Sequence, residues 1–193
     1  MIKMCGRYVL FSDTEMQDIR DIIDEVQRKV NGEIKTGEIF PTDKAPVLIQ
    51  EQGIITSDAV KWGFPNFHNK GVIINSRAET AMGKPIFNRS LEVKRCIIPS
   101  TGFYEWSHEG QKKKYLFNLP GSDALYMAGL WNDFDGERRF VILTTEANAS
   151  MSEIHNRMPV VLTHLEMEQW MNSYQGALNI LQAGRPELVK APA

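Results

Sequence analysis

The chain is poor in cysteine, in net charge and in long apolar runs. Cys5 and Cys96 are the only cysteines among 193 residues. They are too few for a disulfide framework and are not spaced like zinc ligands, so we expect no metal and no cofactor. No apolar run is long enough to span a bilayer, and the N-terminus lacks the apolar stretch of a secretion signal. These absences predict a protein of the reducing cytoplasm.

The net charge is only −2, so the chain has no overall field to attract a polyanion. Any binding of nucleic acid must then come from a local basic patch. The composition, 42% hydrophobic and 24% charged, is typical of a soluble globular domain. Because no repeat, low-complexity tract or linker is present, we predict one domain over residues 1–193. Residues 185–193 are expected to form a loosely held tail.

Three capping-box patterns predict helices. Ser12 to Glu15 is the first, and it precedes apolar residues at helical spacing from Met16 to Val30, with Asn31-Gly32 as a stop. A second pattern over residues 150–153 predicts a short helix that carries His155. A third, over residues 163–166, predicts a C-terminal helix.

Between residues 41 and 143 the pattern changes to short β-type runs separated by turn residues. The predicted strands are Val47–Gln50, Asp58–Trp62, Val72–Ile74, Arg95–Ile98, Phe103–Trp106, Tyr115–Asn118, Leu125–Leu130 and Phe140–Thr144. This series predicts an α+β fold, a single domain with a bent, mostly antiparallel, barrel-like β core flanked by helices.

Glu105 lies between Tyr104 and Trp106 at the end of an apolar strand. A carboxylate among aromatic side chains is partly desolvated, which raises its pKa and suits it to acid–base chemistry. Strand alternation equally allows Glu105 to face water while its neighbours pack. Both interpretations stay open from the residues alone.

Other candidate polar residues follow apolar stretches. His155 has the side chain that titrates nearest neutrality, although a lone histidine is more often structural. Asn75 can position a substrate by hydrogen bonds. Arg77 can hold an anion in a fork geometry or can instead form an ordinary surface salt bridge, for example with Glu79. Cys96 is expected to be a small buried hydrophobe.

Cys5 differs from Cys96 because its neighbours are polar or permissive. Gly6 and Arg7 would leave the Cys5 thiol accessible, and the Arg7 charge would favour the thiolate.

In chain order, seven motifs resemble those of the SOS response-associated peptidase (SRAP) family, whose members shield abasic sites in single-stranded DNA. They span Met4 to about Leu162, and together they form a specific match. They are Met4-Cys5-Gly6-Arg7-Tyr8, Pro41-Thr42 with Pro46-Val47, Trp62-Gly63-Phe64-Pro65, Asn75-Ser76-Arg77-Ala78-Glu79-Thr80, Arg95-Cys96-Ile97-Ile98-Pro99 with Gly102-Phe103-Tyr104-Glu105-Trp106, Ala128-Gly129-Leu130-Trp131, and His155-Asn156-Arg157-Met158-Pro159.

The resemblance implies an enzyme with peptidase activity, whose expected substrate is its own leader, and with an activity that cross-links the protein to abasic sites in DNA. Each protein molecule would react with DNA in a single turnover. Methionine removal would make Cys5 the first residue, and its amine and thiol would close a thiazolidine on the abasic-site aldehyde. By motif position, Glu105 would move protons during imine formation and His155 would assist opening of the sugar. Asn75 would hold the Cys5 amine or the sugar.

The implied partner is single-stranded DNA containing abasic sites, bound by a monomer. The resemblance implies that the DNA-binding groove of the protein is lined by Pro41, Trp62, Phe64 and Arg77, with Thr145 near the DNA backbone. The segment between Phe64 and Val72 is shorter than the loop of many relatives. The basic run Lys112-Lys113-Lys114 could compensate for this shorter loop, but we expect it to be a solvated turn.

Three other functions stay open. An N-terminal-nucleophile amidohydrolase also uses the amine and side chain of a first cysteine. A peptidase would act on the leader of the chain itself, and a noncatalytic protein would bind intact and abasic strands alike. The first two functions depend on whether residues precede Cys5 in the mature protein. We expect Met4 to be the native start, or residues 1–4 to be removed.

Overall fold

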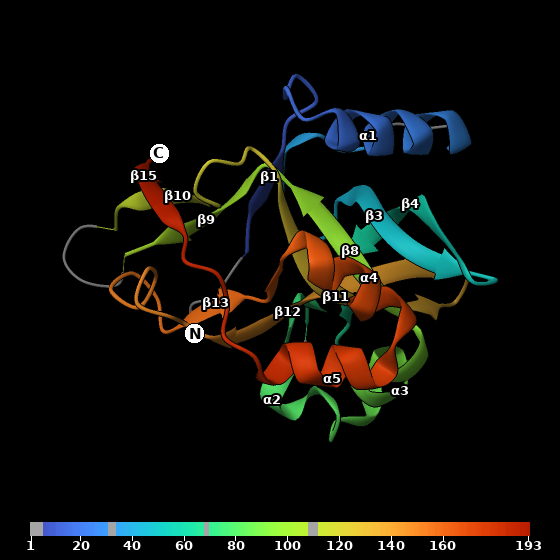
Figure 1. Ribbon diagram of the computed structural model, residues 1–193. Coiled ribbons are helices and arrows are strands. Elements are labelled where there is room, and N and C mark those ends of the chain that lie inside the picture. Colours follow the sequence, from blue (N-terminus) through green and yellow to red (C-terminus); the bar gives the residue numbers. More distant parts are fainter. Residues whose placement is uncertain (1–5, 31–33, 68–69, 108–111) are drawn as a thin grey trace.

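The computed structural model describes residues 6–30, 34–67, 70–107 and 112–193. Figure 1 shows two groups of strands that meet near β1. One sheet is formed by β15 (Val189–Pro192), β10 (Lys114–Asn118), β9 (Gly102–Trp106), β1 (Tyr8–Leu10) and β2 (Gly37–Ile39), in this order. A two-stranded ribbon joins β5 (Phe64–Pro65) to β6 (Val72–Ile73). Both structures are antiparallel.

The larger sheet contains a closed ring of strand pairings. The ring runs through β12 (Glu137–Glu146), β4 (Ile54–Trp62), β3 (Lys44–Glu51), β8 (Arg95–Ser100) and β11 (Leu125–Phe134), and β11 pairs back with β12. All of its pairings are antiparallel except β12 with β4. Three short strands extend it, namely β7 (Asn75–Arg77), β13 (Arg157–Pro159) and β14 (Val161–Leu162). The predicted α+β domain with a barrel-like core is confirmed.

Strand β8 and the middle parts of β11 and β12 are buried on both faces, because one face packs in a core shared with the smaller sheet and the other packs in a second core. In β12, Phe140 and Ile142 face a core shared with the smaller sheet, whereas Val141 and Leu143 face a second core. This alternation follows from the two-residue period of a strand.

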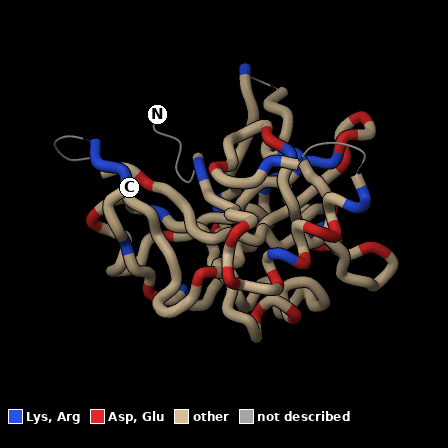
Figure 2. The backbone as a smooth tube through the Cα atoms, turned by 90° about the horizontal axis from the view of Figure 1, so that it is seen from above, with Lys and Arg blue, Asp and Glu red and all other residues tan. Residues whose placement is uncertain are grey.

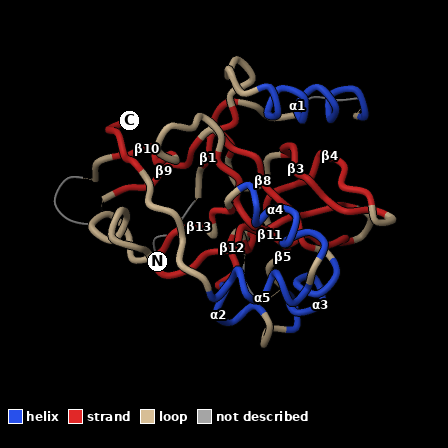
Figure 3. The backbone as a smooth tube through the Cα atoms, viewed as in Figure 1, coloured by secondary structure: helices blue, strands red, loops and turns tan. Residues whose placement is uncertain are grey.

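Four helices cover the outer face, namely α2 (Ala78–Ala81), α3 (Pro85–Val93), α4 (His164–Asn172) and α5 (Tyr174–Gln182). They gather on one side of the strands, and α1 (Gln17–Lys29) lies apart from them (Figure 3). None of the described helices is long and apolar enough to cross a membrane.

Arg95, at the start of β8, joins two of these helices to the ring. Its guanidinium is buried and donates to the carbonyl oxygens of Leu91 at 2.8 Å and Met171 at 3.0 Å. Burial lowers the pKa of Arg95. The last carbonyls of a helix lack partners within the helix, and this side chain supplies donors for them.

The helix starts were predicted with mixed success. Thr163 and Glu166 form the expected capping box at the start of α4. At α1 the predicted box is wrong, because Met16 is the N-cap and makes no side-chain cap hydrogen bond. The apolar stripe of this helix is confirmed by the buried Ile19, Ile23 and Val26; the predicted stop at Asn31-Gly32 reaches beyond the described residues.

The predicted helix around His155 is also wrong, because residues 149–154 form turns. The Ser150 hydroxyl, which the capping box would need, donates to Asn148 Oδ1 at 2.6 Å and accepts the Leu188 N–H at 3.0 Å. This local side-chain bonding competes with helix formation.

The C-terminal tail is held in place, which corrects the expectation of a loose end. Strand β15 pairs antiparallel with β10 over four residues. The Asn148 amide donates to the carbonyl oxygens of Arg185 at 3.2 Å and Pro186 at 3.0 Å. Backbone groups of the tail therefore find partners in two distant parts of the chain.

Candidate functional site

Glu105 lies in β9, directly beside the point where the described chain begins. Strands β1 and β9 are antiparallel, with Tyr8 opposite Phe103. The same register continued by two residues places Gly6, the first described residue, opposite Glu105. Cys5, the residue before Gly6 in the sequence, lies outside the described residues.

Burial decides between the two interpretations of Glu105. Its side chain is 2% exposed, so the solvated alternative is wrong. It shares a strand face with the buried Phe103, and Oε2 accepts the N–H of Trp106 at 3.3 Å. Burial of a carboxylate is costly, and such carboxylates are more frequent at functional sites than elsewhere.

Asn75 is the first residue of β7, which pairs in parallel with the last part of β12. The preceding carbonyl, that of Ile74, accepts two hydrogen bonds, one from Trp62 Nε1 at 3.0 Å and one from the Ile142 N–H at 3.1 Å. These bonds hold the backbone at the entry to Asn75. The position of Asn75 therefore depends on a side chain from β4.

Trp62 and Phe64 lie in the core, which corrects the expectation that they line a DNA groove. Both rings are 0% exposed. Trp62 stacks on Phe140 with ring centroids 6.1 Å apart, and its centroid lies 5.3 Å from that of Tyr8. A side chain without accessible surface cannot stack on a base, so these residues support the site from behind.

Pro41, by contrast, is partly exposed, in a turn that is tied to Trp62. The Thr42 N–H donates to the Trp62 carbonyl at 2.8 Å, and the Trp62 N–H donates to Asp43 O at 2.9 Å. Thr42 adopts a φ of 79°. The turn thus holds a proline at the surface next to the Trp62 strand end.

His155 follows the turns of residues 149–154 and is 8% exposed. The backbone N–H of His155 donates to the Met151 carbonyl at 3.0 Å, and the ring nitrogen Nδ1 accepts the backbone N–H of Arg157 at 3.0 Å. A nitrogen that accepts a hydrogen bond carries no proton. In this arrangement the ring is the neutral tautomer with its proton on Nε2.

Arg157 joins β13 to α2 and β12. Its guanidinium contacts both carboxylate oxygens of Glu79 at 2.8 Å and donates to the Thr144 carbonyl at 2.6 Å. Thr145 Oγ1 lies 3.3 Å from the same carboxylate. Burial works to raise the pKa of Glu79, but the hydrogen bonds of its carboxylate and the charge of Arg157 together outweigh burial, and the pKa is lowered.

Arg77 is exposed and forms no salt bridge with any described residue. The alternative in which it pairs with Glu79 is wrong, because Glu79 is taken by Arg157. Arg77 lies at the end of β7, two residues after Asn75. Its charge is therefore available at the surface beside the candidate site.

Close sequence neighbours of the candidate residues belong to one apolar core. This core contains Tyr8, Ile74, Phe103 and Ile154, which lie within two residues of Gly6, Asn75, Glu105 and His155 in the sequence. In the parts of the chain that the structure describes, no three His, Cys, Asp or Glu side chains form a group that could hold a metal ion.

The sequence matches a family model for the SOS response associated peptidase (SRAP) over residues 4–188. The chain belongs to this family. It is 35% identical to the abasic site processing protein YoaM of Bacillus subtilis, over 93% of this chain and 84% of that protein. It is 28% identical to the abasic site processing protein YedK of Escherichia coli, over 87% of this chain and 79% of that one.

The fold is also similar to that of a crystal structure of a protein from Bacteroides thetaiotaomicron. The TM-score is 0.78 at 23% identity, over 97% of this chain and 91% of that one. A crystal structure of a phage-related protein from Bordetella bronchiseptica gives a TM-score of 0.74 at 22% identity, over 98% of this chain and 94% of that one. These likenesses show that the fold is shared with both solved structures.

The SRAP chain also carries a cationic and aromatic cluster on the face of the small sheet opposite to Glu105. The Arg7 guanidinium lies 4.3 Å from the centroid of Phe40 and 5.1 Å from that of Trp106, and it pairs with Glu38 at 3.2 Å. Glu38 also pairs with Lys114 at 2.8 Å. The predicted solvated turn of three lysines is therefore wrong for Lys114, which begins strand β10.

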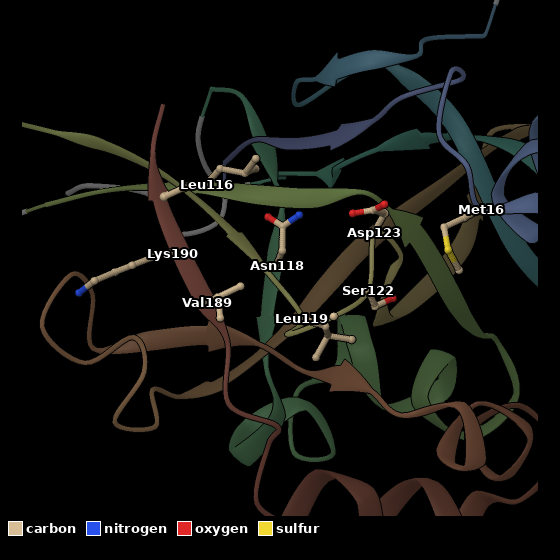
Figure 4. Close-up of a pocket in the computed structure, with 10 residues that line it drawn as sticks. Met16, Leu116, Asn118, Leu119, Ser122, Asp123, Val189 and Lys190 are labelled. Atoms are coloured by element: carbon tan, nitrogen blue, oxygen red, sulfur yellow. The ribbon is translucent and has the colours of Figure 1, made fainter.

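A pocket of about 590 Å³ lies away from the candidate site. Figure 4 shows Leu116 and Asn118 of β10 lining it together with residues of the following turn and of β15. Because Tyr115 pairs with Glu105, the neighbouring Leu116 faces the opposite side of the sheet. No candidate residue of the SRAP site lines this pocket.

Sequence reasoning assigned no role to Arg157, although the residue stands in a motif of the family. The available signal was its position two residues after His155, where a backbone N–H can reach the ring. The partner of its guanidinium could not be predicted, because Glu79 is 78 residues away.

Proposed function

We propose that this SRAP protein recognises abasic sites in single-stranded DNA and shields them by a covalent cross-link through Cys5. Two observations support the proposal: relatives that share most of the chain are named abasic site processing proteins, and Glu105 is buried opposite Gly6. The second observation carries the mechanism, because a buried carboxylate lies opposite Gly6, the residue that follows Cys5 in the sequence.

The chemistry requires Cys5 to be the first residue. Its α-amine condenses with the ring-opened aldehyde of the abasic sugar and releases water, giving an imine. The thiol then adds to the imine carbon, its proton goes to the imine nitrogen, and a five-membered thiazolidine closes. Closure removes the imine that would promote strand cleavage, and it is fast because both groups belong to one residue.

Glu105 takes the acid–base role in this sequence of steps. Condensation needs a proton taken from the amine and a proton given to the departing hydroxyl, and one carboxyl group can do both in turn. Its burial excludes bulk water from the exchange. Asn75 holds the amine or the sugar from β7, whose backbone is anchored by Trp62.

His155 assists opening of the sugar through Nε2, the ring nitrogen that carries the proton. The sugar-phosphate backbone of the DNA is held by surface groups. Arg77 supplies a cation for a phosphate and Pro41 an apolar edge, while Thr145, whose hydroxyl donates to Glu79, lies beside the DNA backbone. Residues of both signs of charge are intermixed along the tube in Figure 2, so we propose that DNA binding relies on these local contacts. We further propose that a monomer in the cytoplasm performs this function.

Exposure of Cys5 has two routes. In the first, translation begins at Met4 and an aminopeptidase removes that methionine. In the second, the protein cleaves the bond before Cys5 itself, which is the peptidase activity that the family description names. Expression of the full chain and of a chain started at Met4, followed by intact mass measurement, distinguishes the two routes.

The test of the proposed function mixes protein that begins at Cys5 with a single-stranded oligonucleotide carrying one abasic site. A species that survives denaturation and migrates as protein plus DNA is the expected result. The Cys5→Ser variant forms no stable adduct, and Glu105→Gln forms it at least about 100-fold more slowly, which is the usual contribution of acid–base catalysis.

Matched controls separate the other functions. An oligonucleotide with a tetrahydrofuran analogue has no aldehyde, so it is bound without an adduct. Equal adduct formation by wild type and Cys5→Ser would contradict the mechanism. Release of ammonia from glutamine by the Cys5-start protein would favour the amidohydrolase, and equal binding of intact and abasic strands without an adduct would favour a noncatalytic role.

A further inference from the structure

His155 is held by a short chain of contacts that ends at Glu79. Its ring accepts the backbone N–H of Arg157 through Nδ1 at 3.0 Å. The Asn156 carbonyl between them accepts the Ala147 N–H at 3.1 Å. The backbone from His155 to Arg157 is thus attached to the end of β12, and the N–H that reaches the ring belongs to an immobilised segment.

The Arg157 side chain anchors the same segment on a third element. The guanidinium meets Glu79 of α2 at two points, each 2.8 Å, and also reaches the Thr144 carbonyl. Its side chain is 14% exposed. A two-point contact between a guanidinium and a carboxylate is both stronger and more directional than a single contact.

We propose that Glu79 and Arg157 form a positioning pair for His155, which holds the Arg157 N–H against Nδ1 and keeps the ring proton on Nε2. The catalytic consequence rests on the proposed function. Neither residue of the pair has to touch the reacting atoms for this role, and the pair acts through the backbone of β13.

The consequence concerns what His155 can do to the sugar. A neutral ring whose Nδ1 accepts a hydrogen bond presents a donor at Nε2. His155 therefore donates a hydrogen bond to a sugar oxygen during ring opening and does not act as a base there. Loss of the pair frees the Arg157 N–H, and the ring then samples both tautomers and the charged form.

The first test is a nitrogen NMR spectrum of the histidine rings in the full chain at neutral pH. His164 is exposed at the start of α4 and serves as the internal reference. We expect Nδ1 of His155 to show the shift of an unprotonated, hydrogen-bonded nitrogen. In Glu79→Gln the ring shifts of His155 should move toward those of His164.

Glu153→Gln is the matched control, because it removes one carboxylate charge two residues from His155. Glu153 pairs with Lys190 and is largely exposed, so its loss should leave the His155 ring shifts unchanged. Arg157→Lys is a second variant, which keeps the positive charge but lacks the fork. It should reproduce the shifts of Glu79→Gln.

The second test follows adduct formation by Cys5-start protein over a range of abasic DNA concentrations. At saturating DNA, the rate should fall about tenfold in Glu79→Gln, which is part of the effect of a general acid–base group. The half-saturating DNA concentration should change by less than about threefold, because the pair does not hold the strand.

Two results would overturn the positioning role. One is a wild-type His155 ring with the shifts of His164, and the other is a Glu79→Gln protein that matches Glu153→Gln in both spectrum and rate. Absence of any adduct with the wild type would instead refute the proposed function, while the ring spectrum would still decide whether the pair positions His155.

Discussion

Replacing Trp62 with phenylalanine tests whether this residue supports the site from the core or contacts DNA. The indole Nε1–H donates to the Ile74 carbonyl, which keeps its second bond from Ile142 in the variant. Loss of one such bond costs about 1 kcal/mol. Phenylalanine retains one ring of the indole, so the packing loss is about 1–2 kcal/mol, less than the full cost of truncation to alanine.

The free energy of unfolding should therefore fall by roughly 2–3 kcal/mol, and Tm by roughly 5–10 °C for a chain of this size. Urea titration and calorimetry measure the two quantities. Trp106→Phe is the matched control, since Trp106 is partly exposed and packs on Arg7. Its replacement should lower the free energy of unfolding by less.

The DNA measurement decides between the two roles. Stacking of a base on an aromatic ring is worth about 1–3 kcal/mol, so a ring that contacts DNA weakens binding by roughly fivefold or more when it is lost. For this measurement the variant is Trp62→Leu, which removes the ring altogether, and we expect the affinity of the folded protein for undamaged single-stranded DNA to stay within about twofold of the wild type. Unchanged stability together with clearly weaker binding would refute the core position of Trp62.

Two further substitutions test the packing and the electrostatics. Gly129→Ala should destabilise the ring of strands by about 1–3 kcal/mol or prevent folding, because the new Cβ would lie 2.8 Å from the Val141 carbonyl; a urea midpoint equal to that of the wild type would contradict this. The hydrogen bond from Lys29 lowers the pKa of Glu25 to about 2 from 4.5, so the stability that Glu25 contributes is complete above pH 4.5 and is lost as the pH falls toward 2. Glu25→Gln should lower stability at pH 6 and flatten its decrease between pH 5 and pH 2, and parallel curves for the two proteins in a pH series of urea titrations would argue against the Lys29 contact.

The strands were the most predictable part of the fold. All eight predicted runs overlap an observed strand, because each is an apolar stretch rich in β-branched or aromatic residues and bounded by turn residues. The short strands β1, β2, β5, β7, β13, β14 and β15 were missed. They have few residues and little apolar periodicity, and they exist because a neighbouring strand offers backbone partners.

The candidate site was predictable as a set of residue types but not as an arrangement. The motifs named Asn75, Glu105 and His155, and the structure shows that close sequence neighbours of all three belong to one apolar core. Trp62 shows the limit of motif reasoning, because an aromatic ring in a motif can serve the ligand or the core. Only its complete burial distinguishes the two.

The sequence by itself determined the family, the β-rich pattern and the residue types available for chemistry, since these depend on local order along the chain. The tertiary structure alone decided which groups meet. Glu105 is shielded from solvent because β9 pairs with β1 and β10. Arg157 forms a salt bridge with Glu79 because β7 and β13 both pair with β12. Contacts between residues tens of positions apart depend on strand register and packing, and neither is encoded in any short stretch of the chain.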